Sequence, residues 1–188
     1  GDERRKAGSD CVHAAMFEPG GGGINAARVV VELGGHATAV HTAGGPVGEM
    51  VAAMVAESGV ENITIPIAQH TRESFTVHER GSGRLYRFVL PGPELADSEW
   101  RRCLTVVSDL LAPGTVLLVS GSLPPGMPVD MAARLARTAR EVGARLLVDI
   151  SGPAMHAALA EGVFMVRFNR PEFEEYVGRP MADIDERG

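Results

Sequence analysis

Short apolar runs alternate with helix-like segments along most of this chain. Runs with few polar residues predict strands at 12–17, 37–42, 115–120, 145–150 and 163–167. Apolar residues at helical spacing, often closed by a glycine, predict helices at 24–33, 47–57, 97–111, 130–142, 153–160 and 172–177. Strands and helices that alternate in this order predict a layered α/β domain with a mostly parallel sheet.

The middle of the chain follows a period-two pattern instead. Residues 74–79 and 85–90 alternate between apolar and polar positions and flank a short turn rich in glycine. This spacing predicts a β-hairpin. Because an alternating strand has one apolar face, we expect one face of the hairpin to be buried and the other to contact solvent. We interpret it as part of a small β layer that stands apart from the main sheet.

A run of four glycines, Gly20 to Gly23, precedes the first predicted helix. Glycine loses the most backbone freedom on folding, so the run favours a loop that turns through positive φ close to a ligand. The free N–H groups and the dipole of the following helix would attract an anion or another polar ligand. A flexible linker is the alternative, but linkers are rarely followed directly by an ordered apolar segment.

The composition excludes several classes of partner. A chain of 188 residues can form one domain with a sizeable core. Its formal net charge of −6 provides no long-range attraction to nucleic acid or to an anionic membrane, so we expect neither partner. No apolar run approaches the ~18 residues of a membrane span. Cys11 and Cys103 indicate neither a disulfide framework nor a zinc site, and we expect that the charged N-terminal segment is not a secretory signal. We expect a cytoplasmic protein.

Polar side chains follow several of the predicted strands. Ser122, Asp149 and the pair Arg167 and Asn169 all lie near the carboxyl ends of strands, where parallel sheets bind ligands. Ser122 could donate to a phosphate or a sugar hydroxyl, or it could belong to an ordinary turn. Asn169 and Glu172, spaced i and i+3, could hold a water-coordinated Mg²⁺, or they could cap a helix.

Arg72 and Arg87 lie beside or within the predicted hairpin. Either could make charge-assisted contacts to a substrate phosphate, although arginines on hairpins are more often only solvated. A serine hydrolase is not indicated. The residue two positions after Ser122 is Pro124, whereas a nucleophile elbow requires glycine there.

Taken together, these stretches resemble the ribokinase-like (PfkB) family of carbohydrate kinases. The similarity follows the order of the family's motifs from about residue 9 to residue 183. The matching stretches are Phe-Glu-Pro-Gly-Gly-Gly-Gly-Ile-Asn at 17–25, Tyr-Arg-Phe-Val-Leu-Pro-Gly at 86–92, Ser-Gly-Ser-Leu-Pro-Pro-Gly at 120–126, Val148-Asp149, Ser151-Gly152 and Asn169-x-x-Glu172. The resemblance implies a ribokinase-like α/β fold, with a mostly parallel sheet flanked by helices and a small β lid. Residues 1–188 would be one incomplete kinase domain, with lid segments at about 9–18 and 71–91.

The resemblance also implies ATP-dependent phosphorylation of a sugar hydroxyl, with Mg²⁺ accompanying ATP as the co-substrate. By matching positions, Gly21, Gly22 and Asn25 would contact the sugar. Arg72 and Ser122 would hold a phosphate that the sugar already carries, and Arg87 is a weaker candidate for the same role. Asn169 and Glu172 match a motif implicated in Mg²⁺ and phosphate handling, which leaves the direct metal ligands open. In relatives the lid contributes to a homodimer.

One position in the glycine run bears on the substrate. Family members that act on fructose 1-phosphate or tagatose 6-phosphate usually carry lysine where this chain has Gly22. The resemblance therefore favours fructose 6-phosphate as the substrate and fructose 1,6-bisphosphate as the product, in glycolysis. A kinase for either of the other two sugar phosphates is the alternative.

The chain departs from the family pattern in three places. The family's first strand should precede residue 1, and the Gly-Ala-Gly-Asp motif with the catalytic aspartate should lie beyond Gly188. The usual Lys-Pro-Asn reads Arg167-Phe168-Asn169 here. We therefore expect a chain truncated at both ends that lacks the catalytic base. A catalytically inactive remnant is the alternative to a kinase.

Overall fold

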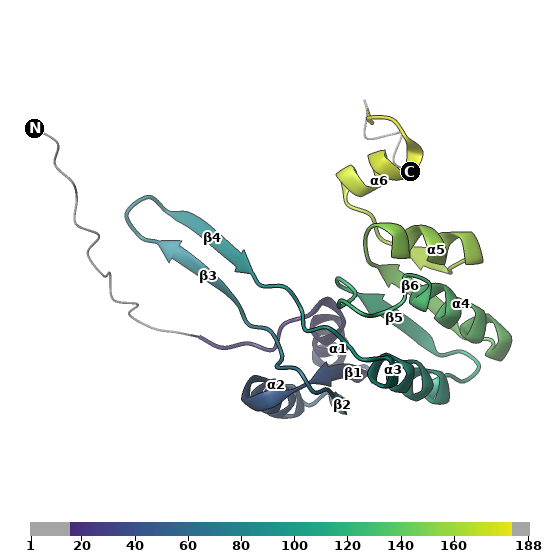
Figure 1. Cartoon of the computed structure of the whole chain (residues 1–188), viewed down its shortest axis with the longest axis horizontal. Helices are drawn as coiled ribbons and strands as arrows, with labels where there is room; N and C mark the ends of the chain where they lie inside the picture. The colour runs from purple at the N-terminus through teal and green to yellow at the C-terminus, as the bar shows by residue number, and fades with distance from the viewer. Residues whose placement is uncertain (1–15, 182–188) are drawn as a thin grey trace, which may run out of the picture.

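The computed structural model describes residues 16–181, in which helices and strands alternate over most of the length (Figure 1). The elements in chain order are α1 (Gly22–Glu32), β1 (Thr38–Ala43), α2 (Gly45–Glu57), β2 (Glu61–Pro66), β3 (Ser74–Glu79), β4 (Arg84–Val89), α3 (Asp97–Leu110), β5 (Val116–Ser120), α4 (Met131–Val142), β6 (Arg145–Asp149), α5 (Pro153–Glu161), β7 (Met165–Val166) and α6 (Arg170–Val177). Most of the strand expected at 12–17 lies outside the described residues, and Met16 and Phe17 are in a loop.

The strands pair as the alternation of elements predicts, but not in one sheet. β1 pairs with β2 in parallel, from Thr38 opposite Glu61 to Ala43 opposite Pro66. β5, β6 and β7 form a second parallel sheet in that order. β3 and β4 form the antiparallel hairpin. The parallel α/β arrangement is confirmed, whereas a single mostly parallel sheet is replaced by two separate ones. The sequence pattern also did not predict β2.

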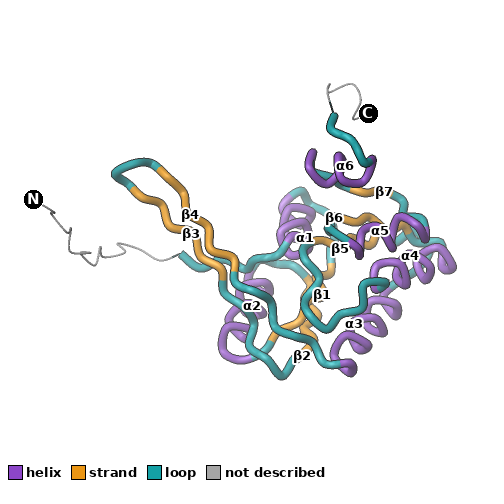
Figure 2. The backbone as a smooth tube through the Cα atoms, turned by 45° about the horizontal axis from the view of Figure 1, so that its top comes forward, coloured by secondary structure: helices purple, strands orange, loops and turns teal. Residues whose placement is uncertain are grey.

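The larger core lies between the β5–β7 sheet and the helices α4 and α5. Alanines on one face of α4 allow α5 to approach closely, and Met155 of α5 fills the space beside them. β6 contributes Leu146 and Val148, which are 2% and 1% exposed. Figure 2 shows the two helices beside one another over this sheet. The core therefore holds the carboxyl ends of β5 and β6 in a fixed register.

Two smaller clusters complete the interior. One joins α1, β1 and α2 through Ile24, Ala39 and Val55. The other links β2, α3 and α4 through Ile65, Trp100 and Met131, with Leu104 and Leu123 also packed against the larger core. This middle cluster connects the β1–β2 layer with the β5–β7 layer.

The hairpin projects away from the rest of the described chain, on the side opposite α4 and α5 (Figures 1 and 2). Every residue of β3 and β4 is exposed, including Phe75 and Phe88, whose rings stack with centroids 4.8 Å apart. The prediction that one face is buried is wrong for the chain by itself, because no other described element covers either face.

Four of the six described helices begin one or two residues away from the expected position. α1 begins at Gly22, so two of the four glycines belong to its first turn rather than to the loop. α3 begins at Asp97, as expected, and its N-cap position is Ala96, which has no polar side chain. The Glu99 carboxylate substitutes for a polar cap, since it accepts from the N–H groups of Ala96 and Ala68 at 2.7 Å each. Within residues 16–181, no helix is long and apolar enough to cross a membrane.

An ion-pair cluster fastens α5 to α4. The Glu161 carboxylate accepts from Arg137 Nη2 at 2.7 Å and from Arg140, whose Nη1 also donates to the Glu161 carbonyl at 2.8 Å. Hydrogen bonds from Arg137 and Arg140 lower the pKa of Glu161 from its usual 4.5 to about 2. The folded state therefore favours the ionised carboxylate. This contribution to stability is present above about pH 4.5 and is lost as the pH falls toward about 2.

We expect Glu161→Gln to lower the melting temperature at neutral pH, because an amide cannot replace the charge that the two arginines face. Since the wild-type carboxylate is protonated in acid, the difference between variant and wild type should shrink below about pH 4. Thermal unfolding at neutral and acidic pH measures it. Glu57→Gln, at an exposed position at the end of α2, serves as the control. A difference that does not change with pH would contradict the assignment.

Candidate active site

The carboxyl ends of β5 and β6 and the start of α1 surround a cavity of about 250 Å³. Three predicted site residues from distant parts of the sequence, Gly22, Ser122 and Glu172, share its wall. The other lining residues are Ser120, Gly121, Asp149, Ile150 and Ser151. Parallel strands end at a common edge, which is why serine, aspartate and glycine from separate segments meet here.

Asp149 is the most connected side chain in this cavity. Its Oδ2 accepts from Ser120 Oγ at 3.0 Å and its Oδ1 from Arg167 Nη1 at 2.9 Å. Its carbonyl oxygen accepts from Gly121 N at 2.9 Å. The hydrogen bond and charge of Asp149 raise the pKa of Arg167, so this guanidinium remains charged beside the Asp149 carboxylate. One carboxylate therefore connects β5, β6 and the segment after β7.

The glycine run lies against the same edge. Gly21, at the N-terminal boundary of α1, has a φ of 116°, which residues with a side chain rarely adopt. Gly22 lies so close to Ser120 that a side chain would not fit between them. Asn25 is exposed in the first turn, and its N–H donates to the Gly21 carbonyl at 3.0 Å. Of these three residues, only Gly22 lines the cavity.

Asn169 and Glu172 form a reciprocal capping box at the start of α6. Asn169 Oδ1 accepts from Glu172 N at 2.9 Å, and Glu172 Oε2 accepts from Asn169 N at 2.8 Å. The helix-cap alternative is thus present in the structure. A role in binding Mg²⁺ stays a prediction, although Glu172 also lines the cavity.

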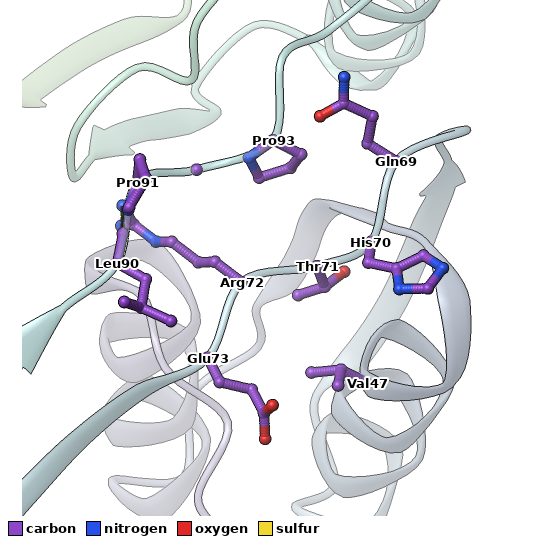
Figure 3. Close-up of a pocket in the computed structure, with 10 residues that line it drawn as sticks. Val47, Gln69, His70, Thr71, Arg72, Glu73, Leu90, Pro91 and Pro93 are labelled. Atoms are coloured by element: carbon purple, nitrogen blue, oxygen red, sulfur yellow. Dashed lines mark hydrogen bonds between the residues drawn. The ribbon is translucent and has the colours of Figure 1, made fainter.

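A second cavity, of about 560 Å³, lies at the base of the hairpin. Arg72 lines it and donates from Nη1 to the Leu90 carbonyl at 3.2 Å. Figure 3 shows its side chain extending toward Leu90 and Pro91. A Cβ built on Gly92 would lie 3.9 Å from Arg72 Nη1 and 3.9 Å from Pro124 Cβ. The guanidinium is therefore close to the loop that carries Ser122.

Arg87 lies in the middle of β4, opposite Thr76, and is exposed. It lines neither cavity. The structure thus gathers Gly22, Ser122 and Glu172 in one cavity, places Arg72 beside the loop of Ser122, and leaves Arg87 on the hairpin. Sequence reasoning did not identify Ser120, because a serine that ends an apolar strand carries no signal of its partners.

Oxygen ligands suit a hard cation such as Mg²⁺, which in enzymes takes one or two carboxylates and completes its shell with water and phosphate. The Asp149 and Glu172 carboxylates line one cavity and are of this kind. Among the described residues, no group of three or more His, Cys, Asp or Glu side chains could hold a metal. The described residues therefore fit a Mg²⁺ ion that is partly coordinated by a bound phosphate ligand, rather than one coordinated by protein side chains alone.

Comparisons with solved structures define the class of this fold. The complex of Escherichia coli phosphofructokinase-2 with fructose 6-phosphate superimposes with a TM-score of 0.86 at 41% identity, covering 92% of this chain and 57% of that one. The tetrameric inhibited form of the same enzyme gives 0.86 at 40% identity, with 93% and 57% covered. The fold is ribokinase-like α/β, as the sequence motifs predict.

A family model described as "pfkB family carbohydrate kinase" matches residues 3–187. The chain belongs to this family. Escherichia coli ATP-dependent 6-phosphofructokinase isozyme 2 is 41% identical over 174 residues, which are 92% of this chain and 56% of that relative. The chain therefore spans little more than half the length of the curated relatives it matches.

Proposed function

We propose that this chain supplies the sugar-phosphate side of an ATP-dependent 6-phosphofructokinase. The complete reaction transfers the terminal phosphoryl group of ATP to fructose 6-phosphate, giving fructose 1,6-bisphosphate and ADP. The observation that carries the proposal is the 250 Å³ cavity, in which Gly22, Ser122 and Glu172 meet at the carboxyl edge of the parallel sheet. The identity of 41% to an enzyme with that name supports the same reaction.

In this proposal the residues divide by chemistry. Gly21, Gly22 and Asn25 contact the sugar, where a backbone without side chains permits close approach. Arg72 and Ser122 hold the phosphate already on the sugar, because a guanidinium and a hydroxyl both donate to phosphate oxygens. Arg87 reaches the substrate only if the exposed hairpin folds over the cavity. Most of such a reaction is positioning and charge stabilisation, which these donors supply.

Mg²⁺ accompanying ATP would supply positive charge that offsets the charge of the phosphates. Glu172 and Asn169 would orient its water shell from the start of α6. Glu172 keeps one carboxylate oxygen, Oε1, outside the capping box. The charged Arg167 lies at the same edge and donates to Asp149 Oδ1. It could bind a phosphate either by giving up this hydrogen bond or by donating to the phosphate and Asp149 together.

We further propose that the hairpin β3–β4 is a lid that pairs with a second copy of the chain. Its stacked Phe75 and Phe88 and its exposed Val77 and Leu85 are apolar surface that pairing would cover. A tetrameric form has been solved for the E. coli relative. The lid boundaries at about 9–18 and 71–91 and the cytoplasmic location remain predictions.

Isothermal titration calorimetry of the 188-residue chain with three sugar phosphates tests the proposal. We expect fructose 6-phosphate to bind at least about tenfold more tightly than fructose 1-phosphate or tagatose 6-phosphate. Preference for either of the others would overturn the choice of substrate. A coupled assay of ADP release runs in parallel. Turnover that Asn169→Ala abolishes would exclude the inactive remnant. If the chain shows no binding of fructose 6-phosphate and no turnover, the proposal is overturned for this chain.

A further inference from the structure

The glycine run and the end of β5 touch without room for a side chain. A Cβ built on Gly22 would lie 2.1 Å from Ser120 Oγ and 3.0 Å from Ser120 Cβ. Heavy atoms that are not bonded do not approach so closely. Any residue other than glycine at position 22 must therefore displace the Ser120 hydroxyl or move the helix start away from the strand.

The need for glycine at this position is steric rather than conformational. Of Gly20 to Gly23, only Gly21 has a positive φ. Gly22 is the first residue of α1, where alanine would otherwise favour the helix. Its neighbour Gly23 has open space, with no atom within 4 Å of a built Cβ. The restriction at position 22 therefore comes from Ser120.

The Ser120 hydroxyl is held in place from the far side. It donates to Asp149 Oδ2 at 3.0 Å in a partly buried setting. The other carboxylate oxygen of Asp149 accepts from Arg167 Nη1 at 2.9 Å. Moving the hydroxyl aside would break its hydrogen bond and disturb a carboxylate that also orients Arg167, two residues before the capping residue Asn169. Leaving such a partly buried acceptor without its donor is costly.

We propose that Ser120 is a positioning residue of the sugar-phosphate site. Its hydroxyl, anchored on Asp149, sets the distance between the glycine run and the carboxyl end of β5, and so the width of the cavity. The role in binding rests on the proposed function, since it assumes that the sugar phosphate occupies this cavity. The steric contact between Gly22 and Ser120 does not depend on the proposed function. We expect substitutions at positions 22 and 120 to be energetically coupled whichever ligand binds.

The test compares four variants of the 188-residue chain: Gly22→Ala, Gly23→Ala, Ser120→Gly and the double variant G22A/S120G. Gly23→Ala is the matched control, because it makes the same change one residue later in the same turn. Fructose 6-phosphate binding is measured by calorimetry at a temperature where circular dichroism shows every variant folded. Urea unfolding midpoints are measured in parallel.

We expect Gly22→Ala to raise the dissociation constant for fructose 6-phosphate at least about tenfold and Gly23→Ala to change it less than about twofold. Ser120→Gly removes the contact that sets the distance, so affinity falls severalfold. In the double variant the new methyl group occupies the space that the hydroxyl leaves. Its dissociation constant should return to within about threefold of that of Ser120→Gly, a rescue that additive damage cannot give.

The outcomes separate this inference from the proposed function. If the wild-type chain does not bind fructose 6-phosphate, the proposed function fails for this chain, and the unfolding midpoints decide the coupling. A larger loss from Gly22→Ala with Ser120 present than in the S120G background supports the inference. Equal losses in the two backgrounds overturn it. Wild-type affinity in Gly22→Ala overturns it as well.

Discussion

Trp100→Ala should lower the free energy of unfolding by about 3–5 kcal/mol, the range for removing a large aromatic side chain from a core. Trp100 is 4% exposed and lies in the cluster that joins β2, α3 and α4. Its indole N–H donates to Asp97 Oδ1 at 3.1 Å, and the Arg101 guanidinium lies 4.4 Å from the ring centroid. Because Trp100 is the chain's only tryptophan, the variant has no tryptophan fluorescence to follow. Urea unfolding is therefore followed by circular dichroism.

The same substitution should also make unfolding less cooperative. The Trp100 cluster lies between the β1–β2 layer and the core of the β5–β7 sheet, so a void there weakens the link between the two. We expect a broader transition, seen as a smaller dependence on urea. Trp100→Phe keeps an aromatic ring and should lose only about 1–2 kcal/mol. Equal stability of Trp100→Ala and wild type would show that the cluster does not connect the layers.

Arg72→Ala should raise the dissociation constant for fructose 6-phosphate about 10- to 100-fold. A hydrogen bond to a charged group contributes about 1.5–3 kcal/mol, and each 1.4 kcal/mol is a factor of ten. Arg72 lines the larger cavity and lies beside the loop of Ser122. Calorimetric titration with the sugar phosphate measures the change.

Arg84→Ala is the matched control for this effect. Arg84 begins β4, is exposed, and lines neither cavity. It removes the same charge from the hairpin region, so a general electrostatic effect would appear in both variants. Arg72→Lys should bind with intermediate affinity, because lysine keeps the charge but not the paired donors of a guanidinium. If Arg72→Ala and Arg84→Ala bind equally well, Arg72 does not hold the phosphate.

The elements with strong local patterns could be predicted from the sequence. The hairpin has alternating residues and a glycine-rich turn, and α4 has apolar residues at helical spacing before Gly143, so both fall close to the expected positions. β2 was missed because Glu61, Asn62 and Thr64 interrupt its apolar residues and Pro66 ends it. Its pairing with β1 is a tertiary contact that a local pattern does not encode.

The candidate site divides in the same way. Ser122, Asp149 and Asn169 could be placed at strand ends, because parallel strands bring their carboxyl ends to one edge. The contact of Gly22 with Ser120 could not, since it depends on the exact approach of α1 to β5, two elements far apart in the sequence. The capping of α3 by Glu99 was missed for a related reason: the same carboxylate also accepts from Ala68, in another segment.

The hairpin gives the molecule a built-in reporter of association. Among residues 16–181, only the β3–β4 ladder protects its amide protons, and an isolated two-stranded ladder is marginally stable in water. In heavy water these amides should exchange early, while those of β6 stay protected by the buried core around Val148. A partner that covers Phe75 and Phe88 would slow exchange along β3 and β4 first. Deuterium uptake in this one segment therefore reports association without any covalently attached probe.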